Sequence, residues 1–233
     1  MVESIICRDY CALSDRAAEI VLETVRQTPE AVLILPTGST PVGMYARLRK
    51  SGADFSGVST MNLDEYCELA AEHPQSYRSF MQKHLFSGVN LRPENIAFPK
   101  WEGNITEQCR RYDAHIEAFP RIDLAILGIG PNGHIGFNEP GDYLIAGTHE
   151  VVLAPETRAA NKRFFGRETV PERAVTMGIA PVFRAERVLL LAAGEQKCAV
   201  VQRALSGNVT PKLPASVLQL HKHVTVLLSK EDS

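Results

Sequence analysis

The chain has 233 residues, of which 45% are hydrophobic and 22% charged. This is the composition of an ordinary globular protein, and the length predicts a single domain over residues 1–233. The 25 Lys and Arg residues against 27 Asp and Glu give a formal net charge of −2, which favours neither nucleic acid nor an anionic membrane as a partner. Any bound anion must therefore be held by local groups.

The cellular location is predicted from what the chain lacks. The apolar run Val188–Ala193 is far shorter than the roughly 20 residues that a membrane helix needs. The first residues do not have the basic and apolar pattern of a secretory signal, so a cytoplasmic location is expected. Scattered cysteines without a CxxC pair predict reduced thiols, and not disulfides or a zinc site. These are Cys7, Cys11, Cys67, Cys109 and Cys198.

Short apolar runs alternate with amphipathic segments along the chain. The runs predict strands that are buried on both faces, at Ala31–Leu35, Val58–Asn62, Ile122–Gly128, Ala174–Ile179, Val188–Ala193 and Val224–Leu228. Helices are expected from the cap Ser14 to Arg26 and from Pro41 to Lys50 with Thr40 as cap, and over Gln75–Phe86, Glu107–Phe119 and Gln196–Leu205. This alternation predicts an α/β fold with a doubly wound, mostly parallel sheet, helices on both faces, and a ligand at the carboxyl ends of the strands.

The first such strand end carries the loop Leu-Pro-Thr-Gly-Ser-Thr-Pro, from Leu35 to Pro41. A glycine that allows close backbone approach is combined with helix amides and hydroxyl groups, which predicts an anion site. The residues concerned are Thr37, Gly38, Ser39 and Thr40. The sequence Gly43-Met-Tyr that follows excludes a Walker A loop, which needs Gly-Lys-Ser/Thr. A capped turn without a ligand is the alternative.

The second strand end, Asn-Leu-Asp-Glu-Tyr, places Asp64 and Glu65 at the rim of the sheet. A carboxylate held there can act as a general base. The alternative is that Asp64 caps the next turn and Glu65 is solvated.

The third strand end is a loop that runs from Leu127 to Pro140 and contains a GxGxxG pattern. Two prolines and further glycines bend it, so it does not match the strand–helix turn of a dinucleotide site. We expect the bends to bring Asn132, His134 and Glu139 together as a proton-transfer set. In that set the acid orients the imidazole, and the amide holds a substrate oxygen.

Two basic residues are further candidates for the anion site. Arg163 precedes two phenylalanines that could hold its guanidinium, and Lys197 lies where a strand passes into a helix. Each alone would be a solvated surface base, but together with the first loop they could neutralise a phosphate dianion. His221 and His223 have metal-like spacing but no third ligand, so a structural role is expected.

Five motifs in this order resemble the glucosamine-6-phosphate deaminase family, from about Leu33 to Leu228. They are Leu-Pro-Thr-Gly-Ser-Thr-Pro, Asn-Leu-Asp-Glu-Tyr, Gly-His-Ile-Gly-Phe-Asn-Glu-Pro, Thr-Arg-x-x-Asn-x-Arg-Phe-Phe and Gly-x-Gln-Lys. The resemblance implies a Rossmann-like α/β fold, a sugar-phosphate substrate, and no metal or nucleotide cofactor. It implies the conversion of glucosamine 6-phosphate and water to fructose 6-phosphate and ammonia.

By this resemblance, Asp64 moves the C2 proton towards C1, and His134, positioned by Glu139, opens the pyranose ring. Asn132 takes the remaining ring-opening position, and Tyr66 and Tyr77 form the wall of the site. The phosphate would be held by the loop and the two bases, namely Thr37, Gly38, Ser39, Thr40, Arg163 and Lys197.

The sequence departs from the allosteric branch of that family in three places. Asn132 stands where that branch has Asp, residues 141–156 contain neither Arg nor Lys, and the chain ends at Ser233 without that branch's longer tail. We therefore expect a monomer, with a small homo-oligomer as the alternative, that is not activated by N-acetylglucosamine 6-phosphate.

The sequence leaves two other functions as alternatives to the deaminase. A 6-phosphogluconolactonase shares the implied fold and a Gly-His loop but lacks the Asn-Glu-Pro ending at Pro140. A non-catalytic sugar-phosphate sensor would need a DNA-binding module, for which residues 1–30 leave room for only one helix.

Overall fold

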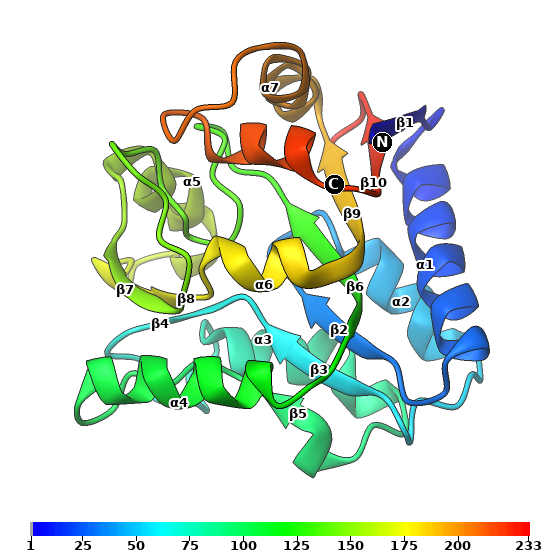
Figure 1. Cartoon of the computed structure of the whole chain (residues 1–233), viewed down its shortest axis with the longest axis horizontal. Coiled ribbons are helices and arrows are strands. Elements are labelled where there is room, and N and C mark those ends of the chain that lie inside the picture. Colours follow the sequence, from blue (N-terminus) through cyan, green and yellow to red (C-terminus); the bar gives the residue numbers. More distant parts are fainter. Residues whose placement is uncertain (1) are drawn as a thin grey trace.

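The main sheet of the computed structural model, which describes residues 2–233, is parallel between every pair of neighbouring strands (Figure 1). In spatial order its strands are β1 (Val2–Ile6), β10 (Val224–Ser229), β9 (Ala185–Ala193), β6 (Ile122–Gly128), β2 (Val32–Leu35), β3 (Ser59–Asn62) and β5 (Ile96–Ala97). The predicted doubly wound α/β fold is confirmed.

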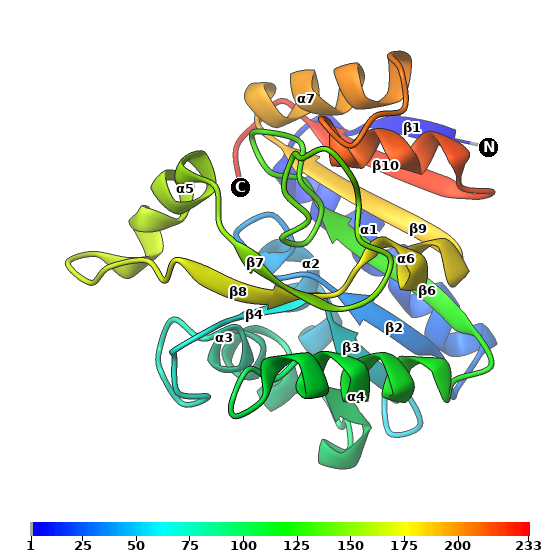
Figure 2. The same cartoon turned by 60° about the vertical axis from the view of Figure 1, so that its left-hand side comes forward.

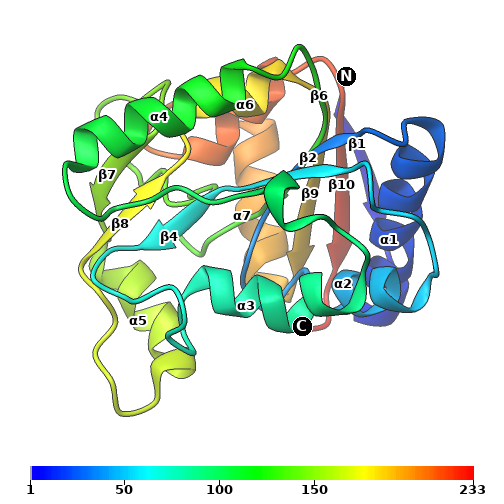
Figure 3. The same cartoon turned by 90° about the horizontal axis from the view of Figure 1, so that it is seen from below.

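Helices cover both faces of this sheet because successive side chains of each strand point in opposite directions. In β2, Leu33 and Leu35 pack into one core, and Val32 and Ile34 pack into the other. The first core is covered by α1 (Tyr10–Gln27), α2 (Val42–Lys50), α3 (Tyr77–His84) and the short 3-10 helix η1 (Phe86–Gly88). The second is covered by α4 (Ile105–Glu117), α6 (Ile179–Arg184), α7 (Glu195–Ser206) and the 3-10 helix η3 (Pro214–Leu220), as Figure 3 shows from below. The short 3-10 helix η2 (Pro93–Asn95) precedes β5.

A second, antiparallel sheet projects from the first (Figure 2). It consists of β4 (Asp64–Tyr66), β8 (Arg173–Thr176) and β7 (His149–Val152), and α5 (Pro155–Phe165) connects β7 to β8. The strand expected over residues 174–179 is observed only as far as Thr176, in β8, and its place in the parallel sheet was wrong because β8 pairs in the antiparallel sheet. Met177 follows β8, Gly178 caps α6, and Ile179 begins that helix. An apolar run does not reveal which sheet it joins, or whether part of it is helical.

The first helix begins earlier than predicted. Its cap is Asp9, whose carboxylate accepts a hydrogen bond of 2.6 Å from the amide of Ala12. Ser14 is buried inside the helix and donates to the carbonyl of Tyr10 at 2.8 Å. A serine can satisfy its hydroxyl in this way within a helix, so its presence alone does not mark a helix start.

Thr40 does not cap the second helix. That helix begins at Val42 after Pro41, which makes no side-chain cap. The other predicted helices agree with α3, α4 and α7 within about two residues at each end, and Ser76 and Asn104 cap α3 and α4. No helix within residues 2–233 is long and apolar enough to cross a membrane.

Candidate active site

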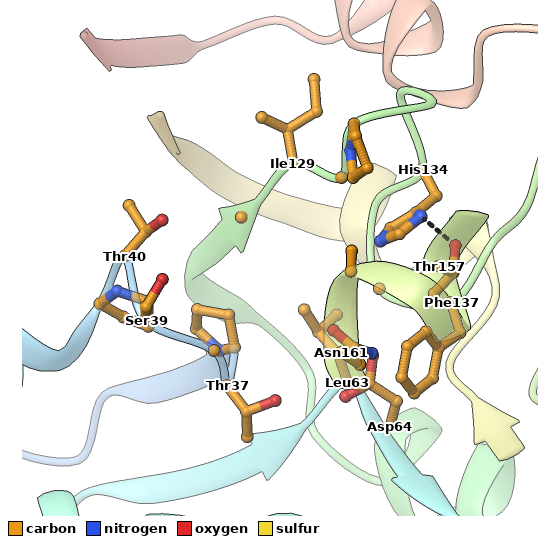
Figure 4. A pocket seen from close by; sticks show the side chains of 18 of the residues that line it. Thr37, Ser39, Thr40, Leu63, Asp64, Ile129, His134, Phe137, Thr157 and Asn161 are labelled. Carbon is orange, nitrogen blue, oxygen red and sulfur yellow. Dashed lines mark hydrogen bonds between the residues drawn. The ribbon is translucent and has the colours of Figure 1, made fainter. Parts of the chain in front are cut away.

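A pocket lies at the carboxyl ends of β2, β3 and β6, where a parallel α/β sheet is expected to bind its ligand (Figure 4). The structure brings most of the predicted site residues to this one pocket: Thr37, Gly38, Ser39, Thr40, Asp64, Tyr77, His134, Arg163 and Lys197 all line it. Three others lie behind its wall, namely Tyr66, Asn132 and Glu139.

The loop from Pro36 to Pro41 forms one side of the pocket. Gly38 has φ +94°, a left-handed conformation that side-chain-bearing residues rarely adopt. The loop is braced from outside by Tyr10, whose hydroxyl donates to the carbonyl of Thr40 at 3.0 Å and accepts from the amide of Gly43 at 2.8 Å. Tyr10 was not predicted from the sequence, because its contacts join the start of α1 to residues some 30 positions later.

Two bases reach this loop from opposite sides. The ammonium of Lys197 in α7 donates to the hydroxyl of Thr40 at 2.8 Å, and Arg163 in α5 donates to Ser39 at 3.1 Å. The guanidinium of Arg163 lies 4.7 Å from the ring centre of Phe164, so one of the two adjacent aromatic rings supports it. Burial and the charge of Arg163 lower the pKa of Lys197. An anion between the two bases would favour the charged form of both.

Asp64 is the first residue of β4, and its side chain faces the pocket. The residue is only 5% exposed. Burial raises its pKa well above the usual value, and the neighbouring carboxylate of Glu65 adds to this effect. A buried carboxylate with a raised pKa is suited to accept a proton near neutral pH.

Glu65 has a different task from its neighbour. Its carboxylate accepts hydrogen bonds of 2.9 Å from the amides of Tyr66, Tyr77 and Arg78. It therefore satisfies two amides in the first turn of α3, which would otherwise lack partners. The alternative considered for this strand end, a capping Asp64 and a solvated Glu65, is wrong: Glu65 caps and is buried.

The imidazole of His134 stands over the backbone of Gly130, where a Cβ atom would lie 2.2 Å from the ring carbon Cε1. Its Nδ1 atom is 3.2 Å from the hydroxyl of Thr157 and 3.5 Å from Oε2 of Glu139. The other ring nitrogen faces into the pocket, as Figure 4 shows. The predicted proximity of His134 and Glu139 is thus observed, and Thr157 is an additional partner.

Asn132 holds Glu139 and faces away from the pocket. Its Nδ2 donates to Oε2 of Glu139 at 2.7 Å, and its Oδ1 accepts from the amide of His134 at 3.2 Å. Burial alone would raise the pKa of Glu139, but hydrogen bonds from His134, Thr157 and Asn132 outweigh it and lower that pKa. The sequence analysis expected the Asn132 side-chain amide to hold a substrate oxygen. In the structure, the Nδ2 and Oδ1 atoms of that amide both have protein partners instead.

Aromatic side chains form two layers along one wall of the pocket. Tyr77 lines the pocket and stacks on Phe137, with ring centres 5.7 Å apart. Tyr66 lies behind it and accepts hydrogen bonds from Asn161 at 2.8 Å and from the hydroxyl of Tyr77 at 3.3 Å. Asn161 lines the pocket from α5, and no role was predicted for it.

The paired histidines near the end of the chain are structural, as predicted. His221 is buried, and its Nε2 lies 2.9 Å from the carbonyl oxygen of Ala185. Among residues 2–233, no group of three or more His, Cys, Asp or Glu side chains is arranged to hold a metal ion.

The loop of residues 36–41 is called the anion loop below, after the role predicted for it. A parallel α/β sheet that places this loop, two bases, a buried carboxylate and an oriented imidazole around one pocket has the features of an enzyme site for a small phosphorylated substrate. The model of the family described as glucosamine-6-phosphate isomerases/6-phosphogluconolactonase matches residues 10–227. The chain belongs to this family.

Individual relatives of similar length are named for one activity, glucosamine-6-phosphate deaminase. A glucosamine-6-phosphate deaminase from Thermoanaerobacter sp. (strain X514) is 45% identical over 233 residues, which cover 97% of this chain and 92% of that protein. Another, from Clostridioides difficile (strain 630), is 44% identical over 97% of this chain and 93% of its own.

Solved structures are similar as well. The structure of a monomeric glucosamine-6-phosphate deaminase superposes with a TM-score of 0.94 at 39% identity and covers 98% of each chain. A 6-phosphogluconolactonase from Thermotoga maritima superposes with a TM-score of 0.80 at 21% identity, over 98% of this chain and 99% of that one. At that identity the likeness shows the fold alone.

Proposed function

We propose that this protein is a glucosamine-6-phosphate deaminase, which converts glucosamine 6-phosphate and water to fructose 6-phosphate and ammonia. The observation that carries the proposal is the placement of Asp64, a buried carboxylate with a raised pKa, in one pocket with His134 and the anion loop. The relatives of 44–45% identity that are named for this activity support it.

In the proposed mechanism the substrate phosphate lies on the loop at Gly38, Ser39 and Thr40, between Arg163 and Lys197. This remote anchor uses binding energy to hold the sugar in place for the chemical steps. His134 then takes the proton of O1 through its pocket-facing nitrogen and returns a proton to O5, which opens the ring. The ring nitrogen on the other side remains with its protein partners.

Asp64 next removes the proton from C2 of the open aldose and delivers it to C1. Through the enolamine, O1 gains a proton and the amine nitrogen loses one, so that the C1 aldehyde becomes an alcohol and the C2 amine becomes an imine. Water adds to the imine carbon, and ammonia leaves to give the C2 ketone. The reaction moves a proton between neighbouring carbons and hydrolyses a C–N bond, and it needs no external oxidant or reductant.

Lactone hydrolysis by the same pocket is the nearest alternative, and the ending of the histidine loop favours the deaminase. Asn138 is buried and donates to the carbonyls of Ile135 and Met177, both at 2.9 Å. These bonds tie the loop back to the end of β8, so that Glu139 turns towards His134. Lactone hydrolysis has no need of a base placed at C2.

We further propose a cytoplasmic monomer without a metal or nucleotide cofactor. The monomeric deaminase of similar structure supports the oligomeric state. The stretch from 141 to 156, which lacks Arg and Lys, supports a lack of activation by N-acetylglucosamine 6-phosphate. A sigmoidal substrate curve that becomes hyperbolic on adding the acetylated sugar would contradict this part.

The test is release of ammonia and formation of fructose 6-phosphate from glucosamine 6-phosphate, with 6-phosphogluconolactone as the comparison substrate. The Asp64→Asn variant should bind the substrate, fail to exchange the C2 proton with deuterated solvent, and release no ammonia. Turnover retained by this variant would refute the role of Asp64, and hydrolysis of the lactone alone would refute the proposed reaction.

A further inference from the structure

We propose that Thr157 is a positioning residue that links Glu139 to His134 and fixes which ring nitrogen of His134 carries the proton. The inference rests on the proposed function, because it assigns a task to the ring-opening imidazole. Thr157 contributes no charge, and its role would be to direct the hydrogen bonds between two groups that do.

The distances make the hydroxyl of Thr157 the nearer partner of the imidazole. Nδ1 of His134 is 3.2 Å from Oγ1 of Thr157 but 3.5 Å from Oε2 of Glu139. A separation of 3.5 Å is long for a direct hydrogen bond between nitrogen and oxygen. Nδ1 of His134 therefore has two oxygen neighbours, and the sequence motif pairing His134 with Glu139 describes only one of them.

The direction of each hydrogen bond follows from the protonation of Glu139. Three donors lower its pKa, so the group is an ionised carboxylate at neutral pH and can only accept. Thr157, one of those donors, has a single hydroxyl proton, and we infer that it goes to the ionised carboxylate of Glu139. Its oxygen lone pairs are then left to face His134. They require a proton on Nδ1, so the pocket-facing Nε2 carries the free electron pair that a base needs.

Hydrogen bonds from Asn132 and from one further donor, the amide of Ala154, hold the carboxylate of Glu139 in place. Asn132 donates to Oε2 at 2.7 Å, and the amide of Ala154 donates to Oε1 at 3.3 Å. Ala154 is the residue before α5, and Thr157 lies in the first turn of that helix. The carboxylate thus contacts both the start of α5 and the hydroxyl that the helix presents, which fixes the threonine relative to the histidine loop.

A threonine at this buried position indicates that its hydroxyl has a task besides packing. Thr157 is only 1% exposed, and α5 has no side-chain cap that would require its hydroxyl. Burying a hydroxyl costs stability unless it is hydrogen-bonded, so valine, which has nearly the same shape, would serve packing as well. The hydroxyl is therefore explained by its two partners, Glu139 and His134.

The test compares Thr157→Val, which removes the hydroxyl at nearly constant shape, with Thr157→Ser, which keeps it. Each variant is assayed for ammonia release across pH, and thermal melting checks that it is folded. Nitrogen-15 NMR of the imidazole reports which nitrogen carries the proton. Other titratable or charged groups that line the same pocket are Asp64 in β4, Tyr77 in α3, Arg163 in α5 and Lys197 in α7, and both variants leave them unchanged.

We expect T157V to lose about 10- to 100-fold in kcat, since an imidazole in the wrong tautomer forfeits much of the effect of general acid–base catalysis. KM should change little, because the contacts of Arg163 and Lys197 with the anion loop remain. T157S should stay within about threefold of the unaltered protein. The NMR spectrum should show a proton on Nδ1 in the unaltered protein and in T157S, and a mixture of tautomers in T157V.

The inference is overturned if T157V keeps the kcat of the unaltered protein, or if the unaltered protein carries the proton on Nε2. Should T157V unfold, the NMR spectrum of the unaltered protein alone still decides the tautomer. Failure of the proposed function would look different, because the unaltered protein would then release no ammonia from glucosamine 6-phosphate.

Discussion

The ammonium group of Lys197 lies 2.8 Å from the hydroxyl oxygen of Thr40, although 157 positions separate the two residues in the sequence. Arg163 approaches Ser39 beside it. The anion loop therefore has a point charge on one side and a planar, multiple donor on the other, which suits a dianion with several oxygens.

Removing either base should weaken binding more than it slows chemistry. We expect Lys197→Gln or Arg163→Gln to raise KM by about 10- to 100-fold, the value of one charge-assisted hydrogen bond, while kcat falls less. Steady-state kinetics of ammonia release measure both. Lys162→Gln, which makes the same change of charge at an exposed position of α5, is the control. Equal KM values for the control and K197Q would contradict the assignment.

The activity should fall in acid as Asp64 becomes protonated. Because burial and Glu65 raise the pKa of Asp64, the acid limb of kcat/KM should have its midpoint above the range of an exposed aspartate, near 4. Replacing Glu65 by Gln removes the nearby negative charge and should move that midpoint to lower pH. The exposed Glu68→Gln is the matched control. A midpoint that moves upward in E65Q would contradict the electrostatic argument.

The ionised carboxylate of Asp64 should lower the free energy of unfolding at neutral pH. The pKa of Asp64 is higher in the folded state than in the unfolded state, so the folded state binds the proton more tightly. Its contribution to stability is full below the unfolded pKa and is lost as pH rises through the folded one. Each pKa unit corresponds to about 1.4 kcal/mol, and 1 kcal/mol moves Tm by about 2–4 °C in a chain of this size.

Asp64→Asn should therefore raise Tm by at least about 2 °C at pH 8 and by less at pH 5. Thermal melts of both proteins across pH provide the measurement. A variant that melts below the unaltered protein at pH 8 would show that the ionised carboxylate is stabilised by its surroundings.

The space above Gly130 should be essential to the imidazole. A Cβ atom at this position would lie 2.2 Å from Cε1 of His134, so Gly130→Ala should displace the ring and reduce kcat by at least about tenfold. Gly141→Ala, directly after this loop, is the control, because a Cβ there has its nearest neighbour at 3.6 Å, an ordinary contact. Circular dichroism should show both variants folded. Unchanged kcat in G130A would mean that the ring can shift without loss.

The sequence predicts the centre of the fold better than its margins. Apart from Asp123, β6 is an apolar strand, because the sheet buries both of its faces, and this pattern is visible in the sequence. The edge strand β1 contains the exposed Glu3 and Ser4, and β5 has only two residues, so neither was predicted. The helix α5 was missed because only Thr157 and Phe165 are buried along it, which leaves no clear helical periodicity.

Site residues could be predicted from the sequence where the residues next to them form an unusual local pattern. Gly38 and its hydroxyl neighbours, Asp64 and His134 each stand in a loop or at a strand end whose composition is unusual for a structural turn. Thr157 and Tyr10 were missed because their roles depend on contacts with residues 23 and 33 positions away in the sequence. Nothing in the immediate neighbourhood of either residue distinguishes it from an ordinary helix position.

The brace between Tyr10 and the anion loop has a consequence for how the protein responds to its ligand. The groups proposed to hold the anion come from the loop after β2, α5 and α7, and Tyr10 of the first helix braces that loop, so the cradle is complete only when these distant segments have all come together. A phosphorylated ligand should therefore bind the native state and not the unfolded chain, and at 100 times its Kd it should add about 2.7 kcal/mol to the unfolding free energy. Inorganic phosphate or a substrate analogue should accordingly slow proteolysis throughout the chain, including at the helix that carries Tyr10.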